Sequence, residues 1–236
     1  MNTKSIDFES GSSQYGYISH ADQTGLNPTS TISIEAWVNL ESEATEPHIV
    51  SKWYTSGNRS YRVFYYDDRI YVDYSGDGTN ANSYKTTDAV ISTGEWIYVA
   101  VTIASATGTV KIYIDGSEVS VTTVSNTGQT SIYYSSADFC VGTYNSPGST
   151  AKYWDGLIDE VRFWADIRTA EEIANYRNVE LTGTETDLRG YWKFNDDATD
   201  ETANGNDLTL VNSPVYSTDV PFSGGVSRRG GFMVFF

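Results

Sequence analysis

The sequence predicts an all-β protein folded as one sandwich of two antiparallel sheets. Short segments of alternating or continuous apolar residues recur along the 236 residues, and turn-forming residues separate them. Aromatic residues make up 14% of the chain and 18 of them are tyrosine, a residue type that suits pleated, half-buried surfaces. Helical patterns are so few that a single β-sandwich with a substantial core accounts for this length most simply.

The first predicted strands lie near the start of the chain. Residues 5–10 and 15–19 are short apolar segments separated by GSSQ. Residues 31–40, TISIEAWVNL, carry apolar side chains at both sets of alternating positions. Because a strand exposed on one face alternates apolar with polar residues, this pattern predicts a central strand covered on both sides.

The middle and the end of the chain supply the remaining strands. Residues 59–78 predict a hairpin whose turn is the Asp67–Asp68 pair, and Asp115–Gly116 predicts a second tight turn within residues 109–119. Further strands are predicted at residues 94–103, 138–144, 157–164, 188–196 and 206–212.

One short helix is expected near residues 169–177. Thr169 followed by Glu172 is a capping box, in which the hydroxyl and the carboxylate satisfy free N–H groups of the first turn. Ile173 and Tyr176 supply an apolar stripe at helical spacing. We expect this helix to cover one end of the sandwich.

The block WDGLIDEVRFW, residues 154–164, places two acids inside a strand. Asp159 and Glu160 interrupt residues that should otherwise pack, and acids in such positions need a counter-charge, a metal or solvent. The simplest alternative to a metal is an ion pair with Arg162 or Arg189.

Composition excludes several functional classes. Fifteen basic against 31 acidic residues give a formal net charge of −16, which argues against nucleic-acid binding and against anionic membrane surfaces. The excess of acids fits either plain solubility or a cation-binding, extracellular protein. No apolar run is long enough for a membrane span.

The lone Cys140 is expected to be a buried structural residue, and neither His20 nor His48 lies in a catalytic or metal-binding pattern.

The two ends of the chain bear on its location and assembly. The first ten residues lack the apolar core of a signal peptide, so a leader was removed or the protein leaves its cell by another route, such as in a virus particle. We therefore expect an extracellular or virion-surface location.

Residues 1–220 are predicted to form the domain, and residues 221–236 a glycine-rich hinge with an apolar tail. Because a free FMVFF end promotes aggregation, residues 222–236 are expected to dock on their own sheet or on a neighbouring molecule.

Taken in order, these segments resemble the laminin-G-like (concanavalin A-like) jelly-roll domain, in the variant common in bacterial and viral proteins. The most specific matches are ISIEAWV, GEWIYVAVTI with GTVKIYIDG, and DGLIDEVRFW, and the resemblance covers about residues 5–212. It implies two antiparallel sheets with loops along one rim, and binding of carbohydrates, proteins or cell surfaces. Many members hold one calcium ion, and some relatives are glycoside hydrolases.

The resemblance makes calcium the best-supported cofactor. Calcium takes about six to eight oxygen ligands. Asp159 occupies the position from which related jelly rolls offer a carboxylate, and the opening strand should lie beside it. A frequent Asp–Gly of the family is replaced here by Glu9-Ser10-Gly11. The candidate calcium ligands are Asp159, Asp7, Glu9, Gly11, Asn206 and Asp207.

Catalysis is not expected. Glycosidases need two carboxylates across a sugar cleft, and related hydrolases carry them in an E-x-D-x-x-E strand. That pattern is absent, and the nearest acids, Asp155 to Glu160, fall in the block assigned to calcium.

Sugar or protein binding at the loop rim is the predicted function. Sugars stack on aromatic rings while amides, acids and arginine bond their hydroxyls. The candidate binding residues are Trp53, Tyr54, Asn58, Arg59, Tyr84, Tyr144, Asn145 and Tyr153. The expected partner is a glycan or a cell-surface protein. The alternative function is a structural subunit of a virion surface or an extracellular filament that assembles through residues 222–236.

Overall fold

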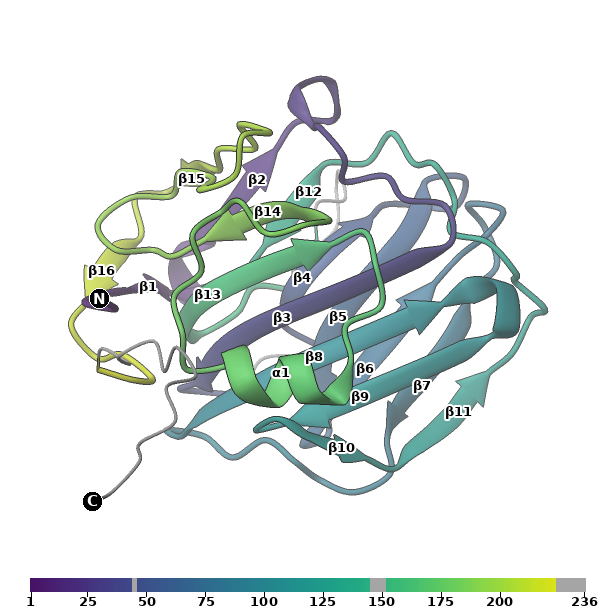
Figure 1. The fold of residues 1–236 in the computed structure, drawn as a ribbon, viewed down its shortest axis with the longest axis horizontal. Coiled ribbons are helices and arrows are strands. Elements are labelled where there is room, and N and C mark those ends of the chain that lie inside the picture. Colours follow the sequence, from purple (N-terminus) through teal and green to yellow (C-terminus); the bar gives the residue numbers. More distant parts are fainter. Residues whose placement is uncertain (44–45, 145–151, 224–236) are drawn as a thin grey trace, which may run out of the picture.

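The structure is a computed structural model that describes residues 1–43, 46–144 and 152–223. It contains two antiparallel sheets of eight strands each, which confirms the predicted all-β sandwich (Figure 1). Sheet A has the order β10-β9-β8-β3-β13-β1-β16, with β14 paired to β13. Its strands are β1 (Ser5–Phe8), β3 (Thr31–Leu40), β8 (Trp96–Ala104), β9 (Thr109–Ile114), β10 (Ser117–Val119), β13 (Gly156–Trp164), β14 (Leu188–Trp192) and β16 (Val215–Ser217).

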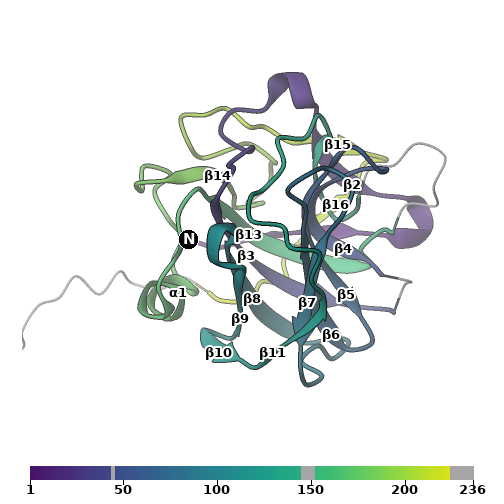
Figure 2. The same cartoon turned by 90° about the vertical axis from the view of Figure 1, so that its right-hand side faces the viewer.

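Sheet B lies against sheet A and has the order β11-β7-β6-β5-β4-β12-β2-β15. Its strands are β2 (Tyr15–Ile18), β4 (His48–Trp53), β5 (Arg59–Tyr66), β6 (Arg69–Tyr74), β7 (Asn82–Thr86), β11 (Val121–Ser125), β12 (Phe139–Val141) and β15 (Thr209–Val211). The helices are α1 (Ala170–Tyr176) and the short 3-10 turns η1 (Ser10–Ser12), η2 (His20–Asp22) and η3 (Ser105–Thr107). Figure 2 shows the two sheets with α1 outside sheet A.

Strand β3 is covered on both faces, as its sequence predicts. Ile34 and Val38 belong to the core between the sheets, whereas Trp37 packs on the opposite face with Tyr98 and with Ile173 of α1. The strand lies between β8 and β13. This arrangement makes the block of residues 156–164 a central strand of sheet A rather than an edge.

The predicted turns and the helix cap are confirmed. Asp67 and Asp68 have positive φ angles of 53° and 56° between β5 and β6, the geometry of a two-residue hairpin turn. At the start of α1, the backbone N–H of Glu172 donates to the Thr169 hydroxyl, and the backbone N–H of Thr169 donates to the Glu172 carboxylate at 2.9 Å. These contacts follow from residues close in sequence, which is why the sequence revealed them.

The described part of the C-terminal segment lies on sheet A. The Phe222 ring is 6.3 Å from the ring of Trp37, and the Trp96 indole donates to Asp219 at 2.9 Å. Residues 224–236, which carry most of the predicted assembly segment, lie outside the described residues. Assembly through residues 222–236 therefore stays a prediction.

The cysteine and the helices bear on two expectations from composition. Cys140 is buried in β12, as predicted for a structural cysteine. Among the described residues, none of the helices combines the length and the apolar character that a membrane crossing requires.

Candidate functional site

A pocket of about 430 Å³ opens on the outer face of sheet B, the face turned away from sheet A. It forms where β4, β5 and β6 lie side by side. Along β5 and β6, Val63 and Val72 point into the core, so their neighbours Arg62 and Asp73 project from the outer face. The pocket is lined by Trp53, Tyr54, Thr55, Ser56, Arg59, Arg62, Asp73, Ala81 and Tyr144.

The Arg62 guanidinium is held rigidly at this site. Its central carbon lies 4.7 Å from the centre of the Trp53 ring and 4.4 Å from that of Phe64. Its Nε and Nη2 atoms contact the same oxygen of Asp73, at 2.7 and 2.6 Å. Cation–π contacts and a charge-assisted pair together fix the direction in which the guanidinium faces.

His48, on β4, contributes to the support of the Arg62 guanidinium. Its ring stacks on Phe64 with centroids 5.1 Å apart and lies 4.9 Å from the Tyr144 ring. Burial, followed by the nearby Arg62 charge, holds the pKa of His48 well below its ordinary value. The imidazole is therefore neutral at physiological pH and adds no charge to the pocket.

Two polar atoms of the pocket have no hydrogen-bond partner within the described protein. Arg59 donates from Nη1 to the carbonyl of Thr79 at 2.6 Å, but its buried Nε donates to nothing. The Oδ1 atom of Asp73 is likewise buried and accepts no bond. Buried polar atoms are normally paired, so a donor and an acceptor are available here to water or to a ligand.

The pocket brings together four of the eight residues predicted for sugar binding: Trp53, Tyr54, Arg59 and Tyr144. Trp53 has a different role from the one expected. Its side chain is only 5% exposed, and the Arg59 and Arg62 guanidiniums lie over its ring. It therefore positions the arginines instead of offering a free face to a sugar. Tyr54 and Tyr144 also line the pocket, and the Tyr144 ring packs on His48.

Three of the other predicted sugar-binding residues, Tyr84, Asn58 and Tyr153, do not line this pocket. Tyr84 is a correction: it is 6% exposed and stacks on Tyr74 in the core, because the register of β7 turns it inward. Asn58 accepts hydrogen bonds from Ser136 and holds a neighbouring loop. Tyr153 packs against Tyr15 at 5.9 Å. Asn145 lies outside the described residues.

Sequence reasoning missed Arg62 and Asp73. Both belong to strands, whereas the residues predicted for sugar binding came from segments rich in aromatic and polar residues that were expected to be loops. The available signal was a charged residue between apolar neighbours in each arm of the hairpin, in YRV and in VDY. The cross-strand pairing of Arg62 with Asp73 follows from the turn at Asp67–Asp68.

A second cluster, of acids, lies in sheet A where β1 and β3 end beside the start of β13. Asp7, Glu9 and Glu41 each offer a carboxylate oxygen within 4.8 Å of the others. Burial and the neighbouring carboxylates raise the pKa of Asp7 and of Glu41. None of the ion pairs between described residues includes these three acids. Their charges therefore lack compensation by a protein cation.

This cluster contains two predicted calcium ligands, Asp7 and Glu9, and adds Glu41, which the sequence did not indicate. Glu41 directly follows β3, whose Leu40 pairs with Gly156 at the start of β13. Gly11 lies two residues beyond Glu9, in the exposed turn η1. Hard carboxylate oxygens this close together fit calcium as a donor set.

Asp159, Asn206 and Asp207 have hydrogen-bond partners of their own within the protein, so their role in binding calcium stays a prediction. Asp159 is fully buried, accepts from the Asn2 side chain at 2.7 Å and from the backbone of Glu160 at 2.9 Å, and does not join Asp7 and Glu9. Asn206 binds the backbone of Thr24, and Asp207 accepts from the backbone of Asp200. These side chains satisfy the protein's own polar groups, which explains their types without a metal.

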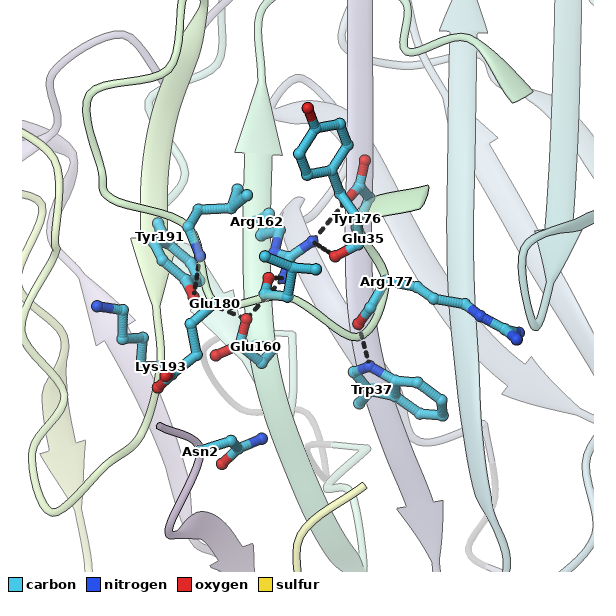
Figure 3. Close-up of polar contacts among 12 residues, drawn as sticks. Asn2, Glu35, Trp37, Glu160, Arg162, Tyr176, Arg177, Glu180, Tyr191 and Lys193 are labelled. Atoms are coloured by element: carbon cyan, nitrogen blue, oxygen red, sulfur yellow. Dashed lines mark hydrogen bonds and ion pairs between the residues drawn. The ribbon is translucent and has the colours of Figure 1, made fainter. Parts of the chain in front are cut away.

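Glu160, the second acid of the block, has the protein counter-charge that was the alternative to a metal. A positive φ of 52° and a register shift mark a β-bulge here in β13. Glu160 accepts from Arg162 at 2.7 Å and from the Tyr191 hydroxyl at 2.7 Å (Figure 3). Arg162 also contacts Glu35 and the backbone carbonyls of Tyr176 and Val179. This buried network joins sheet A to the segment that follows α1.

Comparison with known proteins agrees with the architecture. The model of the concanavalin A-like lectin/glucanases superfamily matches residues 11–174. A proposed carbohydrate-binding protein from Bacteroides ovatus ATCC 8483 superposes with a TM-score of 0.71 at 21% identity; the match covers 94% of this chain and 61% of that protein. This chain therefore spans less than two thirds of the Bacteroides protein.

Two other solved structures are similar over most of their own length. The SAP-like pentraxin from Limulus polyphemus superposes with a TM-score of 0.60 at 12% identity, covering 91% of this chain and 94% of the pentraxin. The CBM40 of the Ruminococcus gnavus IT-sialidase gives 0.53 at 14% identity, covering 72% and 95%. No curated protein matches the chain in sequence.

At these low identities the structural matches establish only the fold. Family membership rests on the family match to residues 11–174. This match covers more than half of the chain and confirms the resemblance seen in the sequence motifs. The protein belongs to the concanavalin A-like lectin/glucanases superfamily.

Proposed function

We propose that this protein is a non-enzymatic module that binds a glycan in the pocket on the outer face of sheet B. The main observation is a pocket lined by aromatic side chains, two arginines and an aspartate, in which Arg59 Nε and Asp73 Oδ1 have no hydrogen-bond partner within the described protein. Sugar hydroxyls both donate and accept, and sugar C–H faces pack on tyrosine rings. A partly enclosed cleft with a few converging polar groups is the usual form of a small-molecule site.

The similar structures support this class of ligand. The Bacteroides ovatus protein is a proposed carbohydrate-binding protein, and the Ruminococcus gnavus module was solved with α2,3-sialyllactose. These descriptions concern those proteins. They favour a glycan over a protein partner as the occupant of this pocket.

The chemistry of the pocket favours binding over catalysis. Glycoside hydrolysis uses two carboxylates flanking the scissile bond. Among the described residues that line the pocket, Asp73 is the one carboxylate, and its Oδ2 atom is engaged by Arg62. A carboxylate committed to a guanidinium in this way positions hydroxyls and is poorly placed to transfer protons.

We further propose that Asp7, Glu9 and Glu41 hold a structural calcium ion. The cluster lies at the ends of β1 and β3 in sheet A, whereas the pocket lies on sheet B, so the ion would stabilise the fold without touching the sugar. Support comes from the close oxygens, the raised pKa values of Asp7 and Glu41, and the buried, unpartnered Oδ1 of Asp7.

Glycan binding is tested by removing the aromatic walls. The variants Tyr54→Ala and Tyr144→Ala are expected to weaken binding to the glycans selected on an array by about tenfold each, equivalent to about 1.4 kcal/mol. Isothermal titration with the best glycan measures the loss. The matched control is Tyr176→Ala, which removes an exposed tyrosine from α1 beside the other sheet. Failure of the unaltered protein to bind any glycan, or unchanged affinity in both pocket variants, would contradict the proposal.

A further inference from the structure

The charge of the sugar pocket is opposite to that of the chain around it. The chain carries a formal net charge of −16, yet two arginines and one aspartate line this pocket. Two pockets of similar size show the opposite balance. One of about 410 Å³ is lined by Glu43 and Asp68 without a basic residue, and one of about 360 Å³ has Asp166, Glu172 and Glu185 around Arg168. An excess of positive charge is therefore a local feature of the outer face of sheet B.

The single acid of the pocket neutralises only one of the arginines. Asp73 binds the Nε and Nη2 atoms of Arg62 through one oxygen, at 2.7 and 2.6 Å. Among the described residues, no carboxylate pairs with Arg59, and the hydrogen bond of its side chain goes to the neutral carbonyl of Thr79. Arg59 is half-buried and its Nε has no partner within the described protein, so its charge is available for an anionic ligand to pair with.

The arginines are also preorganised to receive an anion. Arg62 lies between the rings of Trp53 and Phe64, and Arg59 lies over the Trp53 ring at 5.6 Å. A planar guanidinium held in one orientation presents parallel N–H groups that match the oxygens of a carboxylate or a sulfate. Holding it in place beforehand lowers the entropy cost of binding.

From this geometry we propose that the pocket selects acidic sugars, meaning sugars that bear a carboxylate or a sulfate group. The inference rests on the proposed glycan binding and specifies its ligand. The anionic group compensates Arg59, a neighbouring hydroxyl donates to the free Oδ1 of Asp73, and the sugar ring lies between Tyr54 and Tyr144. A neutral sugar fills the same space but offers no negative charge to pair with Arg59.

The test uses a glycan array printed with matched pairs. The pairs are galacturonate and galactose oligomers, glucuronate and glucose oligomers, sialylated and unsialylated lactose, and 6-sulfated and unsulfated lactose. In at least one pair the acidic member is expected to bind at least about tenfold more tightly than the neutral member. Raising NaCl from 0.05 to 0.5 M should weaken the acidic member and leave neutral members nearly unchanged, because salt screens the charge interaction. The sulfated pair distinguishes the two kinds of acidic group.

Variants of Arg59 separate this inference from a general effect on the fold. Arg59→Gln should reduce acidic binding to the level of the neutral partner, and Arg59→Lys should restore part of the preference. Arg59 is chosen because removing Arg62 would leave Asp73 unpaired. The matched control is Arg69→Gln, since Arg69 pairs with Asp67 in the turn outside the pocket. Equal binding of both members in every pair would overturn acidic selectivity while leaving glycan binding intact. Absence of binding to every glycan would instead overturn the proposed function.

Discussion

Replacing Arg162 by methionine is expected to lower the free energy of unfolding by about 3–5 kcal/mol, because it leaves buried acids without a counter-charge. Arg162 and Glu160 are both fully buried, and Glu35 is 1% exposed. Methionine keeps much of the side-chain volume, so the loss reports on charge and hydrogen bonds rather than on a cavity. Urea unfolding followed by tryptophan fluorescence measures it.

The network itself provides the controls. Burial, only partly opposed by Arg162, raises the pKa of Glu160, so the carboxylate depends on its partners to stay ionised. The double variant Arg162→Met with Glu160→Gln should recover part of the stability, since the unpaired charge is then gone. Lys111, whose ion pair with Glu118 is exposed, provides the matched surface variant Lys111→Met, with an expected loss far smaller than that of Arg162→Met. A similar small loss for Arg162→Met would show that the network contributes little.

Calcium is expected to stabilise the protein by about 2.7 kcal/mol when present at 100 times its dissociation constant. The physical reason is that the ion neutralises Asp7, Glu9 and Glu41, whose oxygens lie within 4.8 Å of one another. Thermal unfolding of the protein stripped with EDTA, with and without added calcium, measures the effect. Magnesium should be less effective because it demands a tighter octahedral shell.

Single variants locate the ion. Glu41→Gln should abolish the response to calcium and, in EDTA, should itself stabilise the protein by removing repulsion. Asp159→Asn is the matched control, because Asp159 is bonded to Asn2 away from the cluster and should leave the calcium response unchanged. If Asp159→Asn removes the response and Glu41→Gln does not, the ion lies at the block first suggested by sequence.

The pH dependence in EDTA follows from the same cluster. Burial and neighbouring carboxylates raise the pKa of Asp7 and of Glu41, so at these sites the folded state binds protons more tightly than the unfolded state. Their contribution is therefore most favourable at and below the ordinary carboxyl pKa and is lost as pH rises through the raised values. Calcium should offset this loss near neutral pH, since it binds the ionised carboxylates.

Local patterns predicted the fold well because they depend on neighbouring residues. The turn at Asp67–Asp68, the capping box of Thr169 and Glu172, and the two-sided burial of β3 all follow from contacts or periodicities within a few residues. The acid cluster was harder to predict. Asp7 lies on β1 and Glu9 directly follows it, but Glu41 reaches them only because β3 and β1 both pair with β13.

The sequence alone determined the β-sandwich, its family and the kind of residue that reaches the surface, because alternation and turn chemistry are properties of short segments. Tertiary structure decided which of those residues form a site. The register of strand pairing in sheet B turned Tyr84 inward and placed Arg62 opposite Asp73 on the outer face. In sheet A, a bulge at Glu160 brought its carboxylate to Arg162. Such positions depend on strand pairing between distant segments, where a shift of one residue exchanges the two faces of a strand.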